Sequence, residues 1–269
     1  MRPRDVAGGL VRACHPLPAL AVTVLAGLLA AGAGGSLSRT ALLVAVVATG
    51  QLVIGWSNDL VDAERDRTVG RPDKPLVRGL VVERQVQVAL ALATAATVVL
   101  SLLAGLTTAW LHLGLVVGSG VAYNLGVKST AWSWLPYAVA FGALPAVAWQ
   151  GVGAGWPPAW VLAVGSLLGV GAHLLNVLPD LAEDEQTGIR GLPHRLGAGL
   201  TQALAPLLLL VGSVVVALAP RAGMTAWSLA ALTGCSALAV LAWTGRGRTP
   251  FVAAIGMAVV NVVSMVVRS

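Results

Sequence analysis

Nine apolar stretches separated by short polar or glycine-rich breaks dominate this sequence of 269 residues. A helix needs roughly 20 consecutive apolar residues to cross the hydrocarbon core of a bilayer. Only 10% of the residues are charged, whereas a soluble domain of this size usually carries about 25%. The predicted fold is therefore an all-α, polytopic membrane bundle, a single domain over 1–269, with helices near 16–34, 40–60, 85–106, 109–126, 132–151, 158–178, 199–219, 224–243 and 250–267.

The basic residues are distributed unequally between the two sides of these helices. Fourteen of the 17 Lys and Arg residues fall on the side of the N-terminus, and only Arg39, Arg221 and Arg268 fall on the other. The positive-inside rule makes the richer side cytoplasmic. Topology thus explains the net charge of +6, and a nucleic-acid partner is not expected. All eleven acidic residues lie on the same side, which the rule does not explain.

The acidic residues gather in two segments, near 58–75 and 176–190, which we expect to be cytoplasmic loops that follow the second and sixth helices. The segments share Asn, Asp, Asp and Gly at intervals of four residues, carried by Asn58, Asp62, Asp66 and Gly70 and, 118 residues later, by Asn176, Asp180, Asp184 and Gly188. Side chains at this interval form one stripe on a helix. Clustered carboxylates repel each other unless cations neutralise them. Mg²⁺ suits such a site because it binds one or two carboxylates together with substrate phosphates.

Several residues near the stripes carry their own expectations. Arg71, Lys74 and Arg190 are suited to bind phosphate oxygens. Asp59 lies off the first stripe, so that we expect it to be a solvated surface charge. Pro179 directly precedes Asp180 and lacks the N–H that a helix needs, which predicts a kink in the second stripe.

A third element lies at the cytoplasmic end of the fourth predicted helix, where Tyr123 is followed by Lys128. Taken alone, a lysine at a helix C-terminus interacts favourably with the helix dipole and anchors the helix at the membrane interface. On the same side as the aspartate segments, Lys128 is also a candidate ligand for a diphosphate. Tyr123 would then orient this lysine or line the pocket.

These motifs resemble those of the UbiA superfamily of intramembrane prenyltransferases, over essentially the whole chain. The family's N-D-x-x-D-x-x-x-D motif is matched by Asn58-Asp59, Asp62 and Asp66, and the R-P-x-[RK]-P that follows it is matched by Arg71-Pro72 and Lys74-Pro75. Its Y-x-x-x-x-K element is matched by Tyr123 and Lys128. Its N-x-x-x-D-x-x-x-D-x-x-x-G motif is matched by Asn176, Asp180, Asp184 and Gly188. The resemblance implies a multi-pass protein of the cell membrane, with a central cavity that opens to the cytoplasm and laterally to lipid.

The resemblance also implies a reaction and a role for each motif residue. Two Mg²⁺ ions would hold a polyprenyl diphosphate, whose ionisation gives an allylic cation that alkylates a hydrophobic acceptor, in the leading interpretation an aromatic compound or quinone precursor. The catalytic residues would be Asp62, Asp66, Asp180 and Asp184. The metal ligands would be these four with Asn58 and Asn176, and the substrate would be bound by Arg71, Lys74, Tyr123, Lys128 and Arg190.

Three other functions use acidic residues in a membrane bundle. A terpene cyclase of the same superfamily ionises the same donor without an external acceptor, and the motifs do not distinguish it from a transferase. A CDP-alcohol phosphotransferase would need a D-G-x-x-A-R segment, which this sequence lacks. A transporter that couples through intramembrane acids would carry them at mid-membrane, whereas these acids follow the cytoplasmic helix ends.

Overall fold

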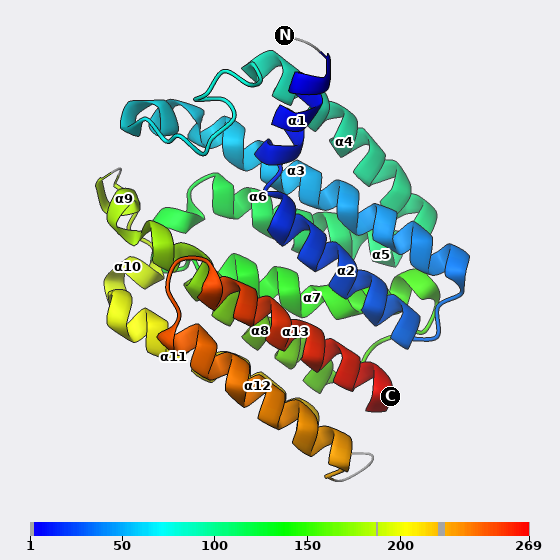
Figure 1. Ribbon diagram of the computed structural model, residues 1–269. Helices are drawn as coiled ribbons and strands as arrows, with labels where there is room; N and C mark the ends of the chain where they lie inside the picture. The colour runs from blue at the N-terminus through cyan, green and yellow to red at the C-terminus, as the bar shows by residue number, and fades with distance from the viewer. Residues whose placement is uncertain (1–2, 187, 220–223, 269) are drawn as a thin grey trace.

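The computed structural model describes residues 3–186, 188–219 and 224–268, which form helices joined by turns (Figure 1). The all-helical membrane bundle predicted from the sequence is confirmed. The α-helices are α1 (Pro3–Ala13), α2 (Pro16–Gly32), α3 (Leu37–Val69), α4 (Glu83–Ala104), α5 (Leu106–Trp110), α6 (Gly118–Asn124), α7 (Leu135–Val152), α8 (Ala159–Val177), α9 (Leu181–Gln186), α10 (Leu192–Leu196), α11 (Ala198–Leu218), α12 (Ala226–Thr244) and α13 (Thr249–Arg268).

Among the described residues, eight segments are long and apolar enough to cross a membrane, or nine if the bent pair α1 and α2 counts as one span. The fourth predicted helix comprises α5, a π-helical segment at Leu111–Val117 and α6. Helix α1 was not predicted, and it meets α2 at an angle of 66°. His15 lies at this break with a φ of 55°, in the left-handed region that residues other than glycine seldom adopt.

Helix α3 is much longer than its apolar stretch and extends into the first aspartate segment. It begins after Ser36, whose side chain accepts a hydrogen bond from the backbone N–H of Arg39 (3.4 Å), and it ends at Gly70 with a φ of 66°. Residues 58–69 are therefore helical, and the prediction of a loop over 58–75 was wrong for most of that range. No proline or glycine interrupts the helix between Gly55 and Gly70, so that the backbone is free to remain helical beyond the apolar stretch.

The second aspartate segment is broken where Pro179 predicted a kink. Helix α8 ends at Val177, a single 3₁₀ turn covers Leu178–Asp180, and α9 begins at Leu181. The two segments therefore differ in backbone structure although their residue spacing is the same.

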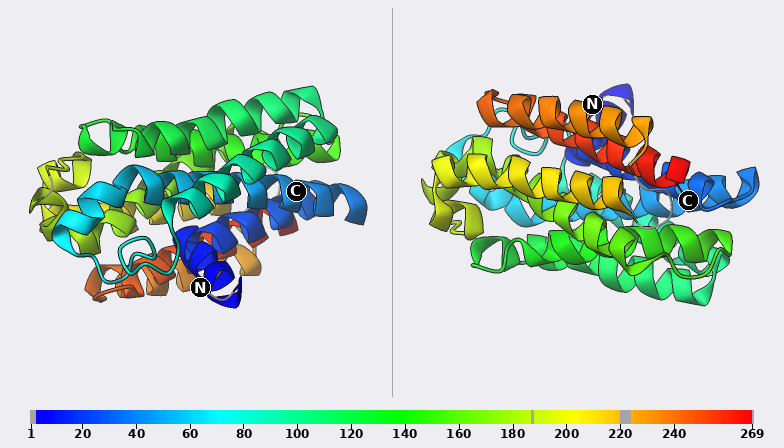
Figure 2. Two further views of the ribbon diagram at one scale, coloured as in Figure 1. Left: turned by 90° about the horizontal axis from the view of Figure 1, so that it is seen from above. Right: turned by 90° about the horizontal axis from the view of Figure 1, so that it is seen from below.

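The polar segments lie together at one end of the bundle. Figures 1 and 2 show the segment after α3, helices α9 and α10 and the turn between α12 and α13 at this end, whereas the turn between α2 and α3 lies at the opposite end. Gly55 brings the break between α1 and α2 against α3, because a Cβ atom at this position would lie 2.5 Å from the carbonyl oxygen of Cys14. This close approach places His15 beside the aspartates of α3.

Candidate functional site

The first aspartate motif occupies the last turns of α3. Asp62 and Asp66 are almost completely buried, with 5% and 1% of their surface exposed. The amide nitrogen of Asn58 donates hydrogen bonds to Asp62 (3.1 Å) and to the side-chain oxygen of Asn124 at the end of α6 (3.2 Å). The ammonium of Lys128 donates to the other oxygen of Asp62. These contacts join α3 to the end of the fourth span.

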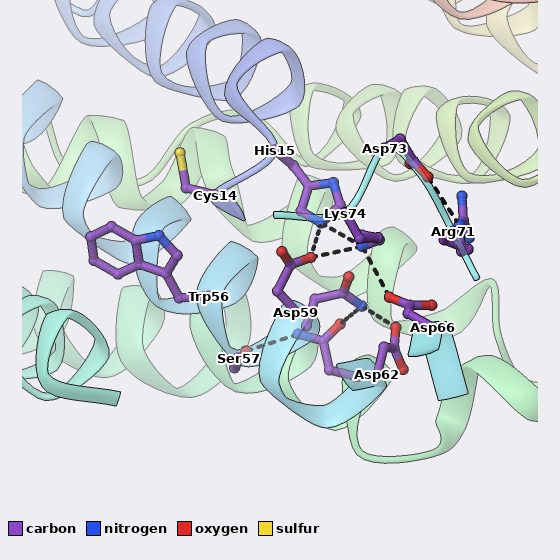
Figure 3. Close-up of polar contacts among 12 residues, drawn as sticks. Cys14, His15, Trp56, Ser57, Asp59, Asp62, Asp66, Arg71, Asp73 and Lys74 are labelled. Atoms are coloured by element: carbon purple, nitrogen blue, oxygen red, sulfur yellow. Dashed lines mark hydrogen bonds and ion pairs between the residues drawn. The ribbon is translucent and has the colours of Figure 1, made fainter. Parts of the chain in front are cut away.

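Asp59 is buried, and the expectation that it is a solvated surface charge was wrong. Only 2% of its surface is exposed. One of its oxygens lies 2.7 Å from the ammonium of Lys74 and 3.2 Å from Nε2 of His15 (Figure 3). Lys74 also lies 3.7 Å from Asp66. The lysine predicted to bind diphosphate is thus held between two buried carboxylates.

The second motif is more open. Asn176, at the end of α8, lines the cavity described below and lies 3.5 Å from the hydroxyl of Tyr137. The side chain of Asp180, in the 3₁₀ turn, is 43% exposed, and one of its oxygens lies 3.7 Å from the guanidinium of Arg71. Arg71 also lies 3.8 Å from Glu183. It therefore connects the segment after α3 to the second motif.

Two residues close to both motifs have altered acidity. Burial raises the pKa of Asp184 to about 6, against the opposing effect of the charge on Arg65. Burial also lowers the pKa of Lys128, although the charge of Asp62 beside it acts in the opposite direction.

Arg190, which the sequence predicts to bind substrate, follows α9 and is exposed. Among the described residues, its carbonyl oxygen accepts a hydrogen bond from the side chain of Arg195 (3.3 Å).

A cavity of about 230 Å³ extends from these motifs into the apolar part of the bundle. Its lining includes Asn58 and Asn176, the first residues of the two motifs. The chain has only two Tyr and two Phe, and all four line this cavity, whereas none of the nine Trp does. Tyr123 packs edge-on against Tyr137, with ring centroids 5.3 Å apart. The apolar wall is completed mainly by Leu, Ala, Val and Pro side chains of α2, α7, α8 and α13.

The sequence matches the UbiA prenyltransferase family over residues 20–262. The chain belongs to this family. A comparison with curated proteins gives no match. Membership of the UbiA family indicates prenyl transfer within a membrane, in agreement with a cavity that lies inside the bundle.

Solved structures of UbiA proteins share the fold. A UbiA homologue from Archaeoglobus fulgidus bound to GPP and Mg²⁺ has a TM-score of 0.72 at 16% identity, and 96% of each chain is covered. The apo structure of a homologue from Aeropyrum pernix K1 gives 0.70 at 20% identity, over 93% of this chain and 97% of that one. A structure of digeranylgeranylglyceryl phosphate synthase gives 0.65 at 16% identity, over 98% of both.

The donor atoms of the UbiA motifs suit magnesium. Asp62 and Asp66 present carboxylate oxygens from one face of α3, and Oδ1 of Asp66 is buried and accepts no hydrogen bond among the described residues, although the guanidinium of Arg65 lies 3.5 Å from it. Within the same residues, no group of three His, Cys, Asp or Glu side chains is arranged to hold a metal ion. Mg²⁺ takes only one or two carboxylates where substrate phosphates supply the other oxygens.

Sequence reasoning missed three contributors to this UbiA site. His15 lies 44 residues from its partner Asp59, and Asn124 lies 66 residues from Asn58. No local pattern reveals such pairs. Arg65 was counted only for topology, although it lies 3.2 Å from Asp62 and 3.5 Å from Asp66. The sequence could have indicated this role, because Arg65 lies between Asp62 and Asp66 in the first motif.

Proposed function

We propose that this protein is a magnesium-dependent prenyltransferase that moves the prenyl group of a polyprenyl diphosphate to an aromatic or quinone-precursor acceptor. The observation that carries the proposal is the continuity of one apolar cavity with both aspartate motifs, through Asn58 and Asn176. Solved relatives of the same fold bind GPP or DMAPP together with Mg²⁺. A polyprenyl diphosphate fits this arrangement, with its diphosphate at the motifs and its prenyl chain in the cavity.

The motif residues would hold the charged end of the donor. Asn58, Asp62, Asp66, Asn176, Asp180 and Asp184 would hold two magnesium ions. When bound, magnesium would neutralise the diphosphate and make it a better leaving group. Arg71, Lys128 and Arg190 carry fixed positive charge at the same end, where it stabilises the charge that develops on the leaving oxygen.

The cavity would protect the reactive carbon. When the donor C–O bond breaks, its electron pair stays on the diphosphate and an allylic cation remains. Water would capture this cation in an open site, but the lining is apolar apart from a few side chains near the motifs. Tyr123 and Tyr137 line this cavity, and an aromatic ring stabilises a cation that lies over its face. A new bond to the acceptor then forms, and the proton that the acceptor loses passes to the released diphosphate.

We place the site at the cytoplasmic side of the cell membrane. Helix α9, the segment after α3 and the turn between α12 and α13 lie at one end of the bundle, and the start of α3, which carries Arg39, lies at the opposite end (Figure 1). The segment after α3 and the turn between α12 and α13 carry Arg71, Lys74, Arg78, Arg246 and Arg248. The positive-inside rule assigns the basic end to the cytoplasm. A donor with a charged head and an apolar chain can then enter from the inner leaflet.

The decisive experiment is to incubate the purified protein with Mg²⁺, prenyl diphosphates of increasing length and a membrane lipid extract as acceptor source. Diphosphate release and the masses of lipid products are measured together. A product heavier than the acceptor by one prenyl group supports transfer. A hydrocarbon product formed without acceptor would instead support a terpene cyclase of the same family.

Matched variants connect this reaction to the motifs. Asp62→Asn and Asp180→Asn should each reduce turnover at least about 100-fold, because each loses a metal-binding charge. Glu64→Gln removes the same charge from an exposed position of α3 and should leave turnover unchanged. EDTA should stop the reaction and Mg²⁺ should restore it. Full turnover of Asp62→Asn at saturating Mg²⁺ would contradict the proposed metal site.

A further inference from the structure

Arg65 lies within the first motif and contacts both of its aspartates. Its guanidinium is 3.2 Å from Oδ2 of Asp62 and 3.5 Å from Oδ1 of Asp66. The two carboxylates are buried, whereas the Arg65 side chain is 22% exposed. Arg65 therefore reaches from a partly open position to the oxygens that the proposed function assigns to magnesium.

The oxygens that Arg65 contacts belong to the motif whose first residue, Asn58, lines the cavity. In the proposed function the charged end of the donor binds at this motif, so that Arg65 lies beside it.

The other cations of the site are held differently. Lys74 has its shortest contact with Asp59, which lies outside both stripes. Lys128 contacts Asp62 from the end of the fourth span, and Arg71 contacts Asp180 from the other motif. Among the described residues, Arg65 is the cation that contacts both Asp62 and Asp66.

A guanidinium and a Mg²⁺ ion cannot both bind the same carboxylate oxygens of Asp62 and Asp66. Like charges repel strongly at such a distance, and a carboxylate oxygen directed at one cation is lost to the other. The flexible stem of an arginine allows its guanidinium to move while its Cα stays in the helix. A bound diphosphate would supply a new partner, because the planar guanidinium matches phosphate oxygens in a bidentate geometry.

We propose that Arg65 is a built-in counter-cation of the site, which neutralises Asp62 and Asp66 until magnesium binds and then becomes a ligand of the donor's diphosphate. The inference rests on the proposed function and adds a residue outside the predicted ligand set. It gives Arg65 opposite effects on two ligands, since the residue competes with free Mg²⁺ but favours diphosphate.

The test measures the binding of Mg²⁺ alone, and then of inorganic pyrophosphate at saturating Mg²⁺, by calorimetry on the purified full-length protein. Arg65→Gln should bind Mg²⁺ about three- to tenfold more tightly, because a competing ion pair is removed. The same variant should bind pyrophosphate about tenfold more weakly or worse, because it loses a charge-assisted hydrogen bond. Arg67→Gln is the matched control. Arg67 lies two residues further along α3 and pairs with Glu83 at 2.6 Å, so that both affinities should equal those of the wild type.

Each outcome decides a part of the inference. Mg²⁺ affinity that is unchanged or weaker in Arg65→Gln refutes the role as counter-cation, and unchanged pyrophosphate affinity refutes the role as diphosphate ligand. If Arg65→Gln does not fold, Arg65→Lys keeps the charge, and it should bind Mg²⁺ like the wild type but pyrophosphate several-fold more weakly. Pyrophosphate affinity equal to that of the wild type would again count against the ligand role. A wild-type protein that binds neither Mg²⁺ nor pyrophosphate would instead refute the proposed function itself.

Discussion

The ion pair between Asp59 and Lys74 makes a quantitative prediction about how the polar end of the bundle is held together. Lys74→Met removes an ammonium that lies 2.7 Å from Asp59 and 3.7 Å from Asp66, and it keeps an unbranched side chain. Removal of one partner from a buried ion pair costs about 3–5 kcal/mol, because a buried charge is left without its counter-ion. Here His15 still contacts Asp59 at 3.2 Å and Arg65 still contacts Asp66 at 3.5 Å. We therefore expect the lower end, a loss of about 3 kcal/mol in the free energy of unfolding.

The assay uses the chain's own cysteines. Cys14 and Cys235 are both buried and unpaired, so that a fluorogenic thiol reagent reports thermal unfolding of the detergent-solubilised protein. For a chain of this size, about 3 kcal/mol corresponds to a fall in Tm of about 6–12 °C. Arg78→Met removes a charge from an exposed position of the same segment and should shift Tm by no more than about 2 °C.

The double variant Asp59→Asn with Lys74→Met separates a lost ion pair from lost packing. Removal of both charges leaves no unpaired ion at Asp59, so the double variant should be more stable than Lys74→Met alone. The reasoning is refuted if Lys74→Met keeps the Tm of the wild type and instead binds pyrophosphate more weakly. Lys74 would then be a diphosphate ligand, as the sequence motif predicts, and not an internal counter-ion of Asp59.

Three further outcomes are expected. Lys128→Ala should lower turnover per folded molecule, and Lys128→Arg should restore it only in part, since a planar guanidinium does not reproduce a compact ammonium; unchanged turnover in Lys128→Ala would reduce the residue to an interface anchor. The pKa of Asp184 is raised to about 6, and Mg²⁺ binds the ionised carboxylate. The affinity for Mg²⁺, measured by calorimetry, should therefore fall as the pH is lowered from about 7 to 5. Asp184→Asn should weaken this pH dependence. Single cysteines in a cysteine-free background should be labelled by an impermeant reagent from the cytoplasmic side at Asp73→Cys and Glu185→Cys and from the opposite side at Arg39→Cys; labelling of the first two from different sides would contradict a shared site.

Much of the fold follows from local sequence because membrane helices are specified by long apolar stretches. The span α11, for example, was predicted at 199–219 and is found at Ala198–Leu218. The break at Pro179 was also predictable, since it depends on one residue that lacks an N–H. The far end of α3 was not, because helix continuation beyond the apolar stretch depends on burial of Asp59, Asp62 and Asp66 by other parts of the chain.

The candidate site was predictable as a set of residues and not as a network. The spacing of Asn58, Asp62 and Asp66 identified a shared face, which the helix provides. It could not identify the counter-ions, because the sequence places Lys74 and Lys128 near the motifs without saying which carboxylate each contacts. Pairing at this end depends on how α3, the segment after it and the end of α6 meet in three dimensions.

The two motifs have the same spacing but different physical properties. In α3 the backbone is continuous, so Asp62 and Asp66 have fixed directions and lie within a buried set of charges. In the second motif Pro179 interrupts the helix, and the side chain of Asp180 is 43% exposed, with Arg71 at 3.7 Å. Loss of a charge therefore lowers the free energy of unfolding by different amounts in the two motifs. At Asp62 it disturbs the buried contacts with Lys128 and Arg65. At Asp180 it removes one exposed interaction of the kind that contributes about 1 kcal/mol or less. A repeat in sequence thus produces one rigid and one accessible half of the site, because a single proline separates their local structures.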